Sequence, residues 1–293
     1  MTLEQLRIFA EVARRQHLTQ AAAALFLTPS AVSSSIKALE ERYGTALFHR
    51  VGRRIELSDA GRIFLVEAER TLASARAADN TLSELGEMRR GSLTIHASQT
   101  IASYWLPPLL VRFTQAHPAI DLALEVGNTD SVAQAIRVGG ADLGFVEGAI
   151  DELGLTSEVV AEDQLVVVVA PRHQWAAGGP LGPDDLLQAQ WVLREKGSGT
   201  RSAFENALAG MGVPVASMRV VLNLPSNEAL RSAVMAGPFA TAISELVVAS
   251  HLQAGLLAKA QLDLPARGFS MLRHPARHRS RAVAAFEEMV RRK

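Results

Sequence analysis

The 293-residue sequence predicts an α/β protein with a small helical N-terminal module, a long connecting helix and a larger module of alternating strands and helices. Two short helical patterns between residues 17 and 44 indicate the first part, and apolar residues three and four positions apart over residues 59–90 indicate the second. From residue 92 onward, β-rich and helical runs alternate, which is typical of α/β domains. We therefore expect domains at 1–58, 59–90 and 91–293, the last with one lobe at about 91–163 and 266–293 and another at about 164–265.

The composition narrows the protein class. Apolar residues make up 48% of the chain, but no apolar run approaches the roughly 18 residues of a membrane span, and no signal-peptide pattern precedes the first helix. The absence of cysteine excludes disulfides and thiolate metal sites. Thirty basic residues balance thirty acidic ones, which argues against a protein that coats nucleic acid indiscriminately but allows a small basic module. We expect a soluble, cytoplasmic protein with no membrane partner.

The second helix of the N-terminal pair starts with a clear signal. Thr28 is a good N-cap, and Pro29 suits the first helical position. One face carries apolar residues that must pack inward: Val32, Ile36, Leu39 and Tyr43. The other face carries Ser30, Ser33, Ser34 and Lys37. A helix with such a face can lie in the DNA major groove, because small side chains allow close approach and hydroxyls can bond to bases or phosphates. For an isolated helix, a solvated polar face is the commoner explanation.

The segment after this helix favours DNA binding. Residues 47–58 read as two short strands around a glycine turn, which predicts a β-wing. Arg50, Arg53 and Arg54 lie at or beside its tip, and beside a helix-turn-helix such guanidinium groups can reach the phosphate backbone. The expected partner is a double-stranded DNA operator, and the candidate contacts are Thr28, Ser30, Ser33, Ser34, Lys37, Arg50, Arg53 and Arg54.

These segments resemble the LysR-type transcriptional regulators. The match runs from Leu3 to Gly61 through TQAAAAL, TPSAVSSSIKALEERYGTALFHR and LSDAG, and later segments extend it over essentially the whole chain. The resemblance implies a winged helix-turn-helix and a two-lobed effector domain similar to periplasmic solute-binding proteins. It also implies a bacterial cytoplasmic regulator that forms homotetramers and is not an enzyme. Pro29 and Ser34 stand where many relatives have Gln and Arg, so the base that is read stays open.

The connecting helix carries a seam of apolar residues, namely Leu65, Ala68, Leu72, Ala75 and Leu82. Asp79 interrupts this seam, and the register could slide to Phe64, Ala75, Ala78 and Leu85. One interpretation is a helix packed on its own chain. The position between two modules and the family resemblance favour a linker helix that pairs with a second copy to form a homodimer.

Two strand-to-helix junctions in the larger module could bind a ligand. They are the runs around Ser98-Gln99-Thr100 and Ser198-Gly199-Thr200, where backbone N–H groups, the helix dipole and hydroxyls supply donors. Ordinary N-capping explains either run alone, but one junction in each lobe predicts two halves of a cleft. The run REKGSGTR is similar to regulators of carbon fixation and sulfur assimilation, which implies a small anionic effector. The candidate effector-binding residues are Ser98, Gln99, Thr100, Thr129, Glu147, Ser198, Gly199 and Thr200, with Lys196 or Arg201 as added charge.

Other chemistry is not indicated. No histidine pair has metal-ligand spacing, and no nucleophile elbow or Walker loop is present, so we expect no metal, no cofactor and no catalytic residue. Two functions then compete. The first is a ligand-responsive transcriptional regulator, and the second is an α/β solute-binding or enzymatic protein with an oligomerising N-terminal helical module. The wing arginines and the capped polar helix favour the first, because oligomerisation does not need them.

Overall fold

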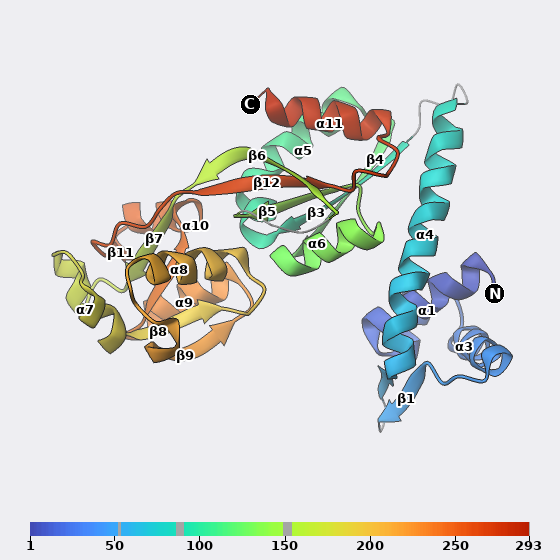
Figure 1. The fold of residues 1–293 in the computed structure, drawn as a ribbon, viewed down its shortest axis with the longest axis horizontal. Coiled ribbons are helices and arrows are strands. Elements are labelled where there is room, and N and C mark those ends of the chain that lie inside the picture. The colour runs from blue at the N-terminus through green and yellow to red at the C-terminus, as the bar shows by residue number, and fades with distance from the viewer. Residues whose placement is uncertain (52–53, 86–90, 149–153, 293) are drawn as a thin grey trace. The chain divides into compact units, whose positions relative to one another are not determined.

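The computed structural model describes residues 1–51, 54–85, 91–148 and 154–292 (Figure 1). The chain forms an N-terminal unit that ends near residue 88 and a C-terminal unit that follows it.

The N-terminal unit is a winged helix-turn-helix, as predicted. Helices α1 (Leu3–Arg15), α2 (Leu18–Ala24) and α3 (Pro29–Tyr43) pack around a core that includes Phe9, Val32 and Leu39. The N-cap of α3 is Thr28, whose Oγ1 accepts a hydrogen bond from the backbone N–H of Ala31 at 3.2 Å. The wing strands β1 (Phe48–Val51) and β2 (Arg54–Leu57) pair antiparallel.

The helix-turn-helix pair is strongly bent. Helices α2 and α3 meet at 108°, within the range common for this motif. In the described part of the chain, no single helix is long and apolar enough to cross a membrane. The α2–α3 pair passes that test only when its two helices are counted together, by length and composition alone.

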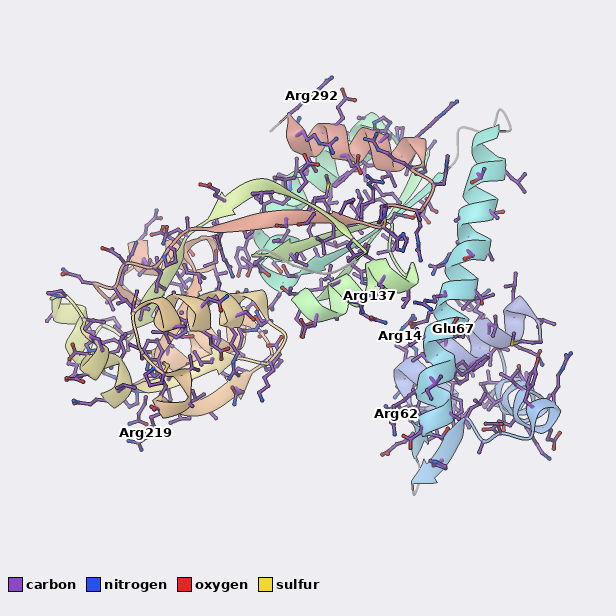
Figure 2. The ribbon with its side chains drawn as sticks, in the orientation of Figure 1. Arg14, Arg62, Glu67, Arg137, Arg219 and Arg292 are labelled. Atoms are coloured by element: carbon purple, nitrogen blue, oxygen red, sulfur yellow. The ribbon has the colours of Figure 1, made fainter. Side chains whose placement is uncertain are left out.

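The long helix α4 (Asp59–Leu85) is used differently along its length. Its outer face carries exposed ion pairs, in which Arg62 contacts Asp59 and Glu67 contacts Arg70 (Figure 2). In its first half, Leu65, Ala68 and Leu72 of the predicted seam pack on the core of the same unit, together with Phe64 of the alternative register. For this half, the interpretation of a helix packed on its own chain was therefore correct. Farther along, Leu82 is 70% exposed.

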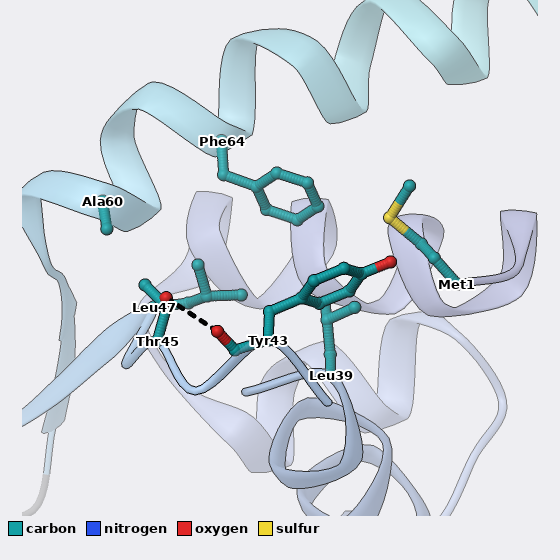
Figure 3. A pocket seen from close by; sticks show the side chains of 7 residues that line it. All are labelled: Met1, Leu39, Tyr43, Thr45, Leu47, Ala60 and Phe64. Carbon is teal, nitrogen blue, oxygen red and sulfur yellow. Dashed lines mark hydrogen bonds between the residues drawn. The ribbon is translucent and has the colours of Figure 1, made fainter. Parts of the chain in front are cut away.

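Tyr43 is a correction to the predicted packing of α3. Val32, Ile36 and Leu39 are buried as expected, but Tyr43 is 55% exposed because the helix ends there, at Gly44 in the left-handed conformation. The Tyr43 ring instead borders a mainly apolar cavity of about 290 Å³ beneath α4 (Figure 3). The other residues that line it are Met1, Leu39, Thr45, Leu47, Ala60 and Phe64.

The C-terminal unit contains two five-stranded sheets, which define two lobes. The first sheet has the order β4-β3-β5-β12-β6. Its strands are β3 (Gly91–Ser98), β4 (Ile120–Gly127), β5 (Leu143–Glu147), β6 (Thr156–Asp163) and β12 (Arg267–Arg273). Helices α5 (Pro107–Ala116) and α11 (Arg281–Arg291) cover one face and α6 (Thr129–Val138) the other (Figure 1).

The second sheet has the order β11-β7-β10-β8-β9. Its strands are β7 (Leu165–Val169), β8 (Gln190–Arg194), β9 (Arg219–Leu224), β10 (Ala240–Ser244) and β11 (Ala258–Lys259). The 3₁₀ turns η2 (Gln174–Ala177) and η3 (Val215–Ser217) and helices α7 (Pro183–Gln188) and α8 (Gly199–Gly210) lie on one side, and α9 (Asn227–Ala236) and α10 (Glu245–Gln253) on the other. Strand β7 is fully buried, as its continuously apolar sequence predicts.

Two chain crossings connect the lobes, one between β6 and β7 and one between β11 and β12. Gln164 lies in the first crossing, and its Nε2 donates to the carbonyls of Leu165 and Leu264, so it ties the crossings together. Beside it, Arg267 Nε donates to Asp163 Oδ2 at 2.8 Å, and both residues are buried. The predicted fold class is confirmed, with the lobes anchored at this double crossing.

Candidate DNA-binding surface and effector cleft

The predicted DNA-reading face of α3 lies on the surface. Thr28, Ser30, Ser34 and Lys37 are exposed and Ser33 is half-buried, whereas Val32, Ile36 and Leu39 on the opposite face are buried. Lys37 Nζ lies 3.4 Å from Glu41 Oε1 in an exposed pair, which holds the side chain only weakly. The face is therefore available to a partner.

The wing arginines lie at the limit of what the structure describes. Arg53 is outside the described residues, as are the side chains of Arg50 and Arg54. The backbone register of the hairpin places Arg50 opposite Ile55 and Arg54 opposite Val51. Phosphate contact by these residues stays a prediction.

The first predicted junction has an unusual helical start. Strand β3 ends at Ser98, and a helix begins at Gln99 and Thr100. A π-helical turn, η1 (Ile101–Trp105), follows directly. At its end, the Leu106 N–H donates to the Ile101 carbonyl at 2.8 Å. Such π-helical turns frequently mark functional sites. Ser98 is 2% exposed and Thr100 is fully buried, so the hydroxyls face the interior of the C-terminal unit.

Gln99 bridges the two lobes. Its Oε1 accepts the backbone N–H of Asn227 at 2.8 Å, and its Nε2 donates to Glu228 Oε2 at 2.7 Å. Tyr104 in η1 donates to the other oxygen of Glu228 at 2.9 Å. Burial and this carboxylate raise the pKa of Tyr104 above its usual value, which keeps the hydroxyl a donor.

Asn227 extends the bridge. Its Nδ2 donates to Thr100 Oγ1 at 3.1 Å, and its Oδ1 accepts from Arg194 Nη1 at 3.0 Å. Arg194 also forms two hydrogen bonds with Glu195, whose Oε1 accepts a long bond of 3.4 Å from Asn128 in the first lobe. The two junctions therefore meet through a continuous polar network.

The second junction approaches the first lobe by its backbone. A Cβ atom on Gly199 would lie 2.5 Å from Thr129 Oγ1 and 2.7 Å from the Glu147 carbonyl oxygen, so only glycine fits. Ser198 is the N-cap of α8, but its side chain makes no capping hydrogen bond. Thr200 Oγ1 accepts from Arg267 Nη1 at 3.0 Å across the cleft. This junction is thus built for close contact between the lobes and not only for capping.

Three buried polar atoms here have no hydrogen-bond partner within the described part of the chain: Ser98 Oγ, Thr129 Oγ1 and Arg267 Nη2. Arg267 Nη2 lies 2.7 Å from Asp163 Oδ2 but is not aligned for a hydrogen bond. Thr129 and Arg267 line a cavity of about 660 Å³ between the lobes. The cavity is also bordered by Glu147, by Gly199, Ser202 and Asn206 of α8, and by residues 265–268 of the crossing.

Glu147 introduces a negative charge beside this cavity. It is only 4% exposed, and its carboxylate has no hydrogen bond or ion pair with the described residues. A buried carboxylate is costly unless it is paired, so a ligand in the cavity gains by offering it a hydrogen.

The predicted effector residues converge from the two lobes, but their roles differ. Gln99 and Thr100 are already bound to Asn227 and Glu228, whereas the hydroxyls of Ser98 and Thr129 have no hydrogen-bond partner in the part of the chain that the structure describes. The two candidates for added charge differ, and for Lys196 a role in the cleft stays a prediction. Arg201 is bound to Glu205 and Asn223 within the second lobe, and Lys196 is exposed.

Several residues of the site were missed from the sequence, namely Asp163, Asn227, Glu228 and Arg267. Arg194 and Glu195 belong to the predicted run REKGSGTR but not to the predicted effector-binding residues. The junction rule could have found Asn227 and Glu228, because β9 ends at Leu224 and α9 begins at Asn227. No local signal marks Asp163 or Arg267, which are about a hundred residues apart in the chain and meet only in the antiparallel β6–β12 pair.

Comparison with known proteins identifies the family. Residues 3–62 match the family described as bacterial regulatory helix-turn-helix protein, lysR family, and residues 86–293 match the LysR substrate binding domain. The chain belongs to the LysR family of transcriptional regulators. As a LysR-type regulator it is a DNA-binding protein and not an enzyme, and the solute-binding or enzymatic alternative is not favoured.

Individual relatives support this. The chain is 35% identical over 288 residues to the uncharacterized HTH-type transcriptional regulator YeiE of Escherichia coli (strain K12), covering 98% of this chain and 96% of that protein. It is 31% identical to a probable RuBisCO transcriptional regulator of Thalassiosira pseudonana, covering 97% and 95%. The predicted resemblance to the carbon-fixation branch is thereby confirmed.

Solved structures share the fold. Full-length CbnR complexed with its target DNA matches with a TM-score of 0.69 at 22% identity, covering 100% of this chain and 99% of that chain. The regulatory domain of CcmR from Synechocystis PCC6803, in complex with 2-PG, matches with a TM-score of 0.63 at 26% identity, covering 69% and 97%. Both agree with the architecture described above.

Proposed function

We propose that this LysR-type regulator changes its binding to a double-stranded DNA operator when a small anion binds in the inter-lobe cleft. The observation that carries the proposal is a pair of buried hydroxyls, Ser98 Oγ and Thr129 Oγ1, that have no hydrogen-bond partner among the described residues, and Thr129 lines the inter-lobe cavity. Each buried donor without a partner costs about 1–3 kcal/mol, and an anion that accepts from them removes that cost. Helix starts at both junctions add positive dipole ends.

The carboxylate of Glu147 refines the expected chemistry. A fully deprotonated anion beside Glu147 would be repelled, so the effector should also carry a hydroxyl, an ammonium group or a protonated oxygen. The groups around the cavity are short, which favours a compact phosphate, carboxylate or sulfur oxyanion over a large aromatic. The 2-PG bound to the regulatory domain of CcmR is consistent with this class.

The polar bridge supplies a way to transmit binding. Gln99 and Thr100 hold Asn227 and Glu228 of the other lobe, so a ligand that takes over these donors changes what holds the lobes together. A ligand shifts such an equilibrium only by its differential affinity for the two lobe arrangements. The linker helix would pass the change to the DNA-binding units.

The linker helix α4 also suggests how copies of the chain assemble. The second half of α4 exposes Leu82, which suits pairing with a second copy into a homodimer, and the family implies a homotetramer in the bacterial cytoplasm. Leu82→Asp should lower the oligomeric mass measured by light scattering at micromolar concentration. A monomeric parent protein would exclude this assembly.

Titration calorimetry of the full chain tests the effector site. Sulfite, sulfate, phosphate, 2-PG and small carboxylates serve as ligands, with Ser98→Ala and Thr129→Val as site variants. We expect one of these anions to bind the parent and both variants to lose about tenfold in affinity, since each removes one hydrogen bond to a charged group.

Thr241→Val is the matched control, because Thr241 Oγ1 is also buried and has no hydrogen-bond partner among the described residues, but it lies within strand β10 and belongs neither to the two strand-to-helix junctions nor to the residues that line the cavity. It should bind as the parent does. Binding of a neutral aromatic in place of every anion, or parental affinity in both site variants, would exclude the proposal.

A further inference from the structure

Phe26, in the turn between α2 and α3, has two unusual properties. Its side chain is 94% exposed, the largest value among the exposed large apolar residues of the described chain. Its φ is +56°, in the left-handed region, where Gln16 is the other non-glycine residue among those that the structure describes. The conformation is imposed by the turn, in which Phe26 N–H donates to the Ala23 carbonyl at 3.2 Å and Leu27 N–H to the Ala22 carbonyl at 2.9 Å.

Neither property helps the unit to fold. A left-handed conformation is disfavoured for an aromatic residue, whereas glycine or asparagine adopts it readily. Full exposure of a phenyl ring forgoes the stabilisation that burial would give. Residues kept in strained conformations cluster at functional sites, so the ring itself is the feature that needs a partner.

The position of Phe26 indicates which partner. It lies two residues before Thr28, the cap of α3, and the N-terminal end of a reading helix is the part that contacts bases in the major groove. The exposed Thr28, Ser30 and Ser34 continue this surface along α3. DNA offers apolar groups at this place, namely thymine methyl groups and the deoxyribose rings beside the groove.

We propose that Phe26 is a DNA-contacting residue, whose ring packs on apolar groups of the duplex next to the reading helix. The contact carries no charge. It should therefore raise affinity without changing the dependence on salt, in contrast to the wing arginines. The inference concerns the established DNA-binding unit and does not depend on the effector proposal.

The test uses the full chain and a duplex that the parent protein selects from a random-sequence pool. Phe26→Asn removes the ring and relieves the left-handed strain, and Phe26→Tyr keeps the ring. By fluorescence anisotropy we expect Phe26→Asn to bind about five- to tenfold more weakly with an unchanged salt slope, and Phe26→Tyr to bind within about twofold of the parent. The melting temperature of Phe26→Asn should equal or exceed that of the parent, because Asn suits the turn.

Leu256→Asn, which removes a 48% exposed apolar side chain from the effector unit, is the control and should leave DNA affinity unchanged. The same duplex made with deoxyuridine in place of thymidine separates the two apolar sources. If the methyl groups are the partner, this duplex weakens the parent but not Phe26→Asn. If the sugars are the partner, it affects both proteins equally.

A folded Phe26→Asn that binds DNA like the parent would overturn the proposal. So would a loss of affinity that accompanies dissociation of the oligomer in light scattering, since Phe26 would then contact a second copy of the chain and not DNA.

Discussion

The DNA-reading face and the effector cleft use the same residue types in opposite settings. On α3, Thr28, Ser30 and Ser34 are exposed, whereas in the cleft Ser98 and Thr200 are at most 2% exposed. The reading face can meet a partner much larger than itself without rearrangement. The cleft encloses its ligand between two lobes, so its polar groups also hold the lobes together.

The difference in exposure decides whether ligand binding and the stability of the folded protein depend on the same groups. A hydroxyl on the surface keeps its water when DNA is absent, and its loss changes little in the free protein. A hydroxyl or charge inside the cleft has protein partners or none, so its loss changes the folded state as well. Substitutions of cleft groups that have protein partners should therefore cost stability, and substitutions on the reading face should cost only affinity.

The largest effect is expected at the buried ion pair of the lobe crossing. Arg267→Met removes the partner of Asp163, both nearly fully buried, and should lower the free energy of unfolding by about 3–5 kcal/mol because the carboxylate is left without its charge partner. Lys259→Met breaks an exposed pair with Glu245 and should cost less than about 1 kcal/mol. Urea unfolding measures both, and similar losses would contradict the comparison.

The next largest loss of stability is expected at Gly199, one of two glycines in α8 that can be compared. Gly199→Ala places a methyl group 2.7 Å from the Glu147 carbonyl oxygen and should cost about 1–3 kcal/mol, since backbone cannot easily move away. Gly210→Ala, at the other end of the helix, meets no atom within 4 Å and should be neutral or slightly stabilising. Thermal unfolding of the two variants compares them directly. Equal melting temperatures would mean that the lobes do not need this close approach.

The smallest effect on stability is expected at the DNA-binding unit. Arg50→Ala and Arg53→Ala should each lower the slope of log K against log salt by about 1 and weaken binding on all sequences, because each removes a phosphate contact. Ser34→Ala should change the preference between sites and leave the salt slope unchanged. All three should keep unfolding free energies within about 0.5 kcal/mol of the parent. An unchanged slope in both arginine variants would exclude the wing assignment.

The sequence by itself determined the elements and the two surfaces. Capping rules were enough to predict the start of α3 from Thr28 and Pro29. Strand-to-helix junctions were enough to locate Ser98 and Gly199. Both predictions succeed because capping, periodicity and helix dipoles act over a few residues. Periodicity also suggested a dimer seam in α4, but whether an apolar stripe meets its own chain or another is not a local property.

Only the tertiary structure decided which groups are free for a ligand. The same junction rule could not tell that Thr100 is bound to Asn227 while Thr129 Oγ1 has no hydrogen-bond partner among the described residues. Nor could it place Arg267 beside Asp163, since the two meet through a strand pairing of residues about a hundred positions apart. Hydrogen bonds between lobes depend on distances that the folded sheets set, and these distances are not encoded in any short stretch of the sequence.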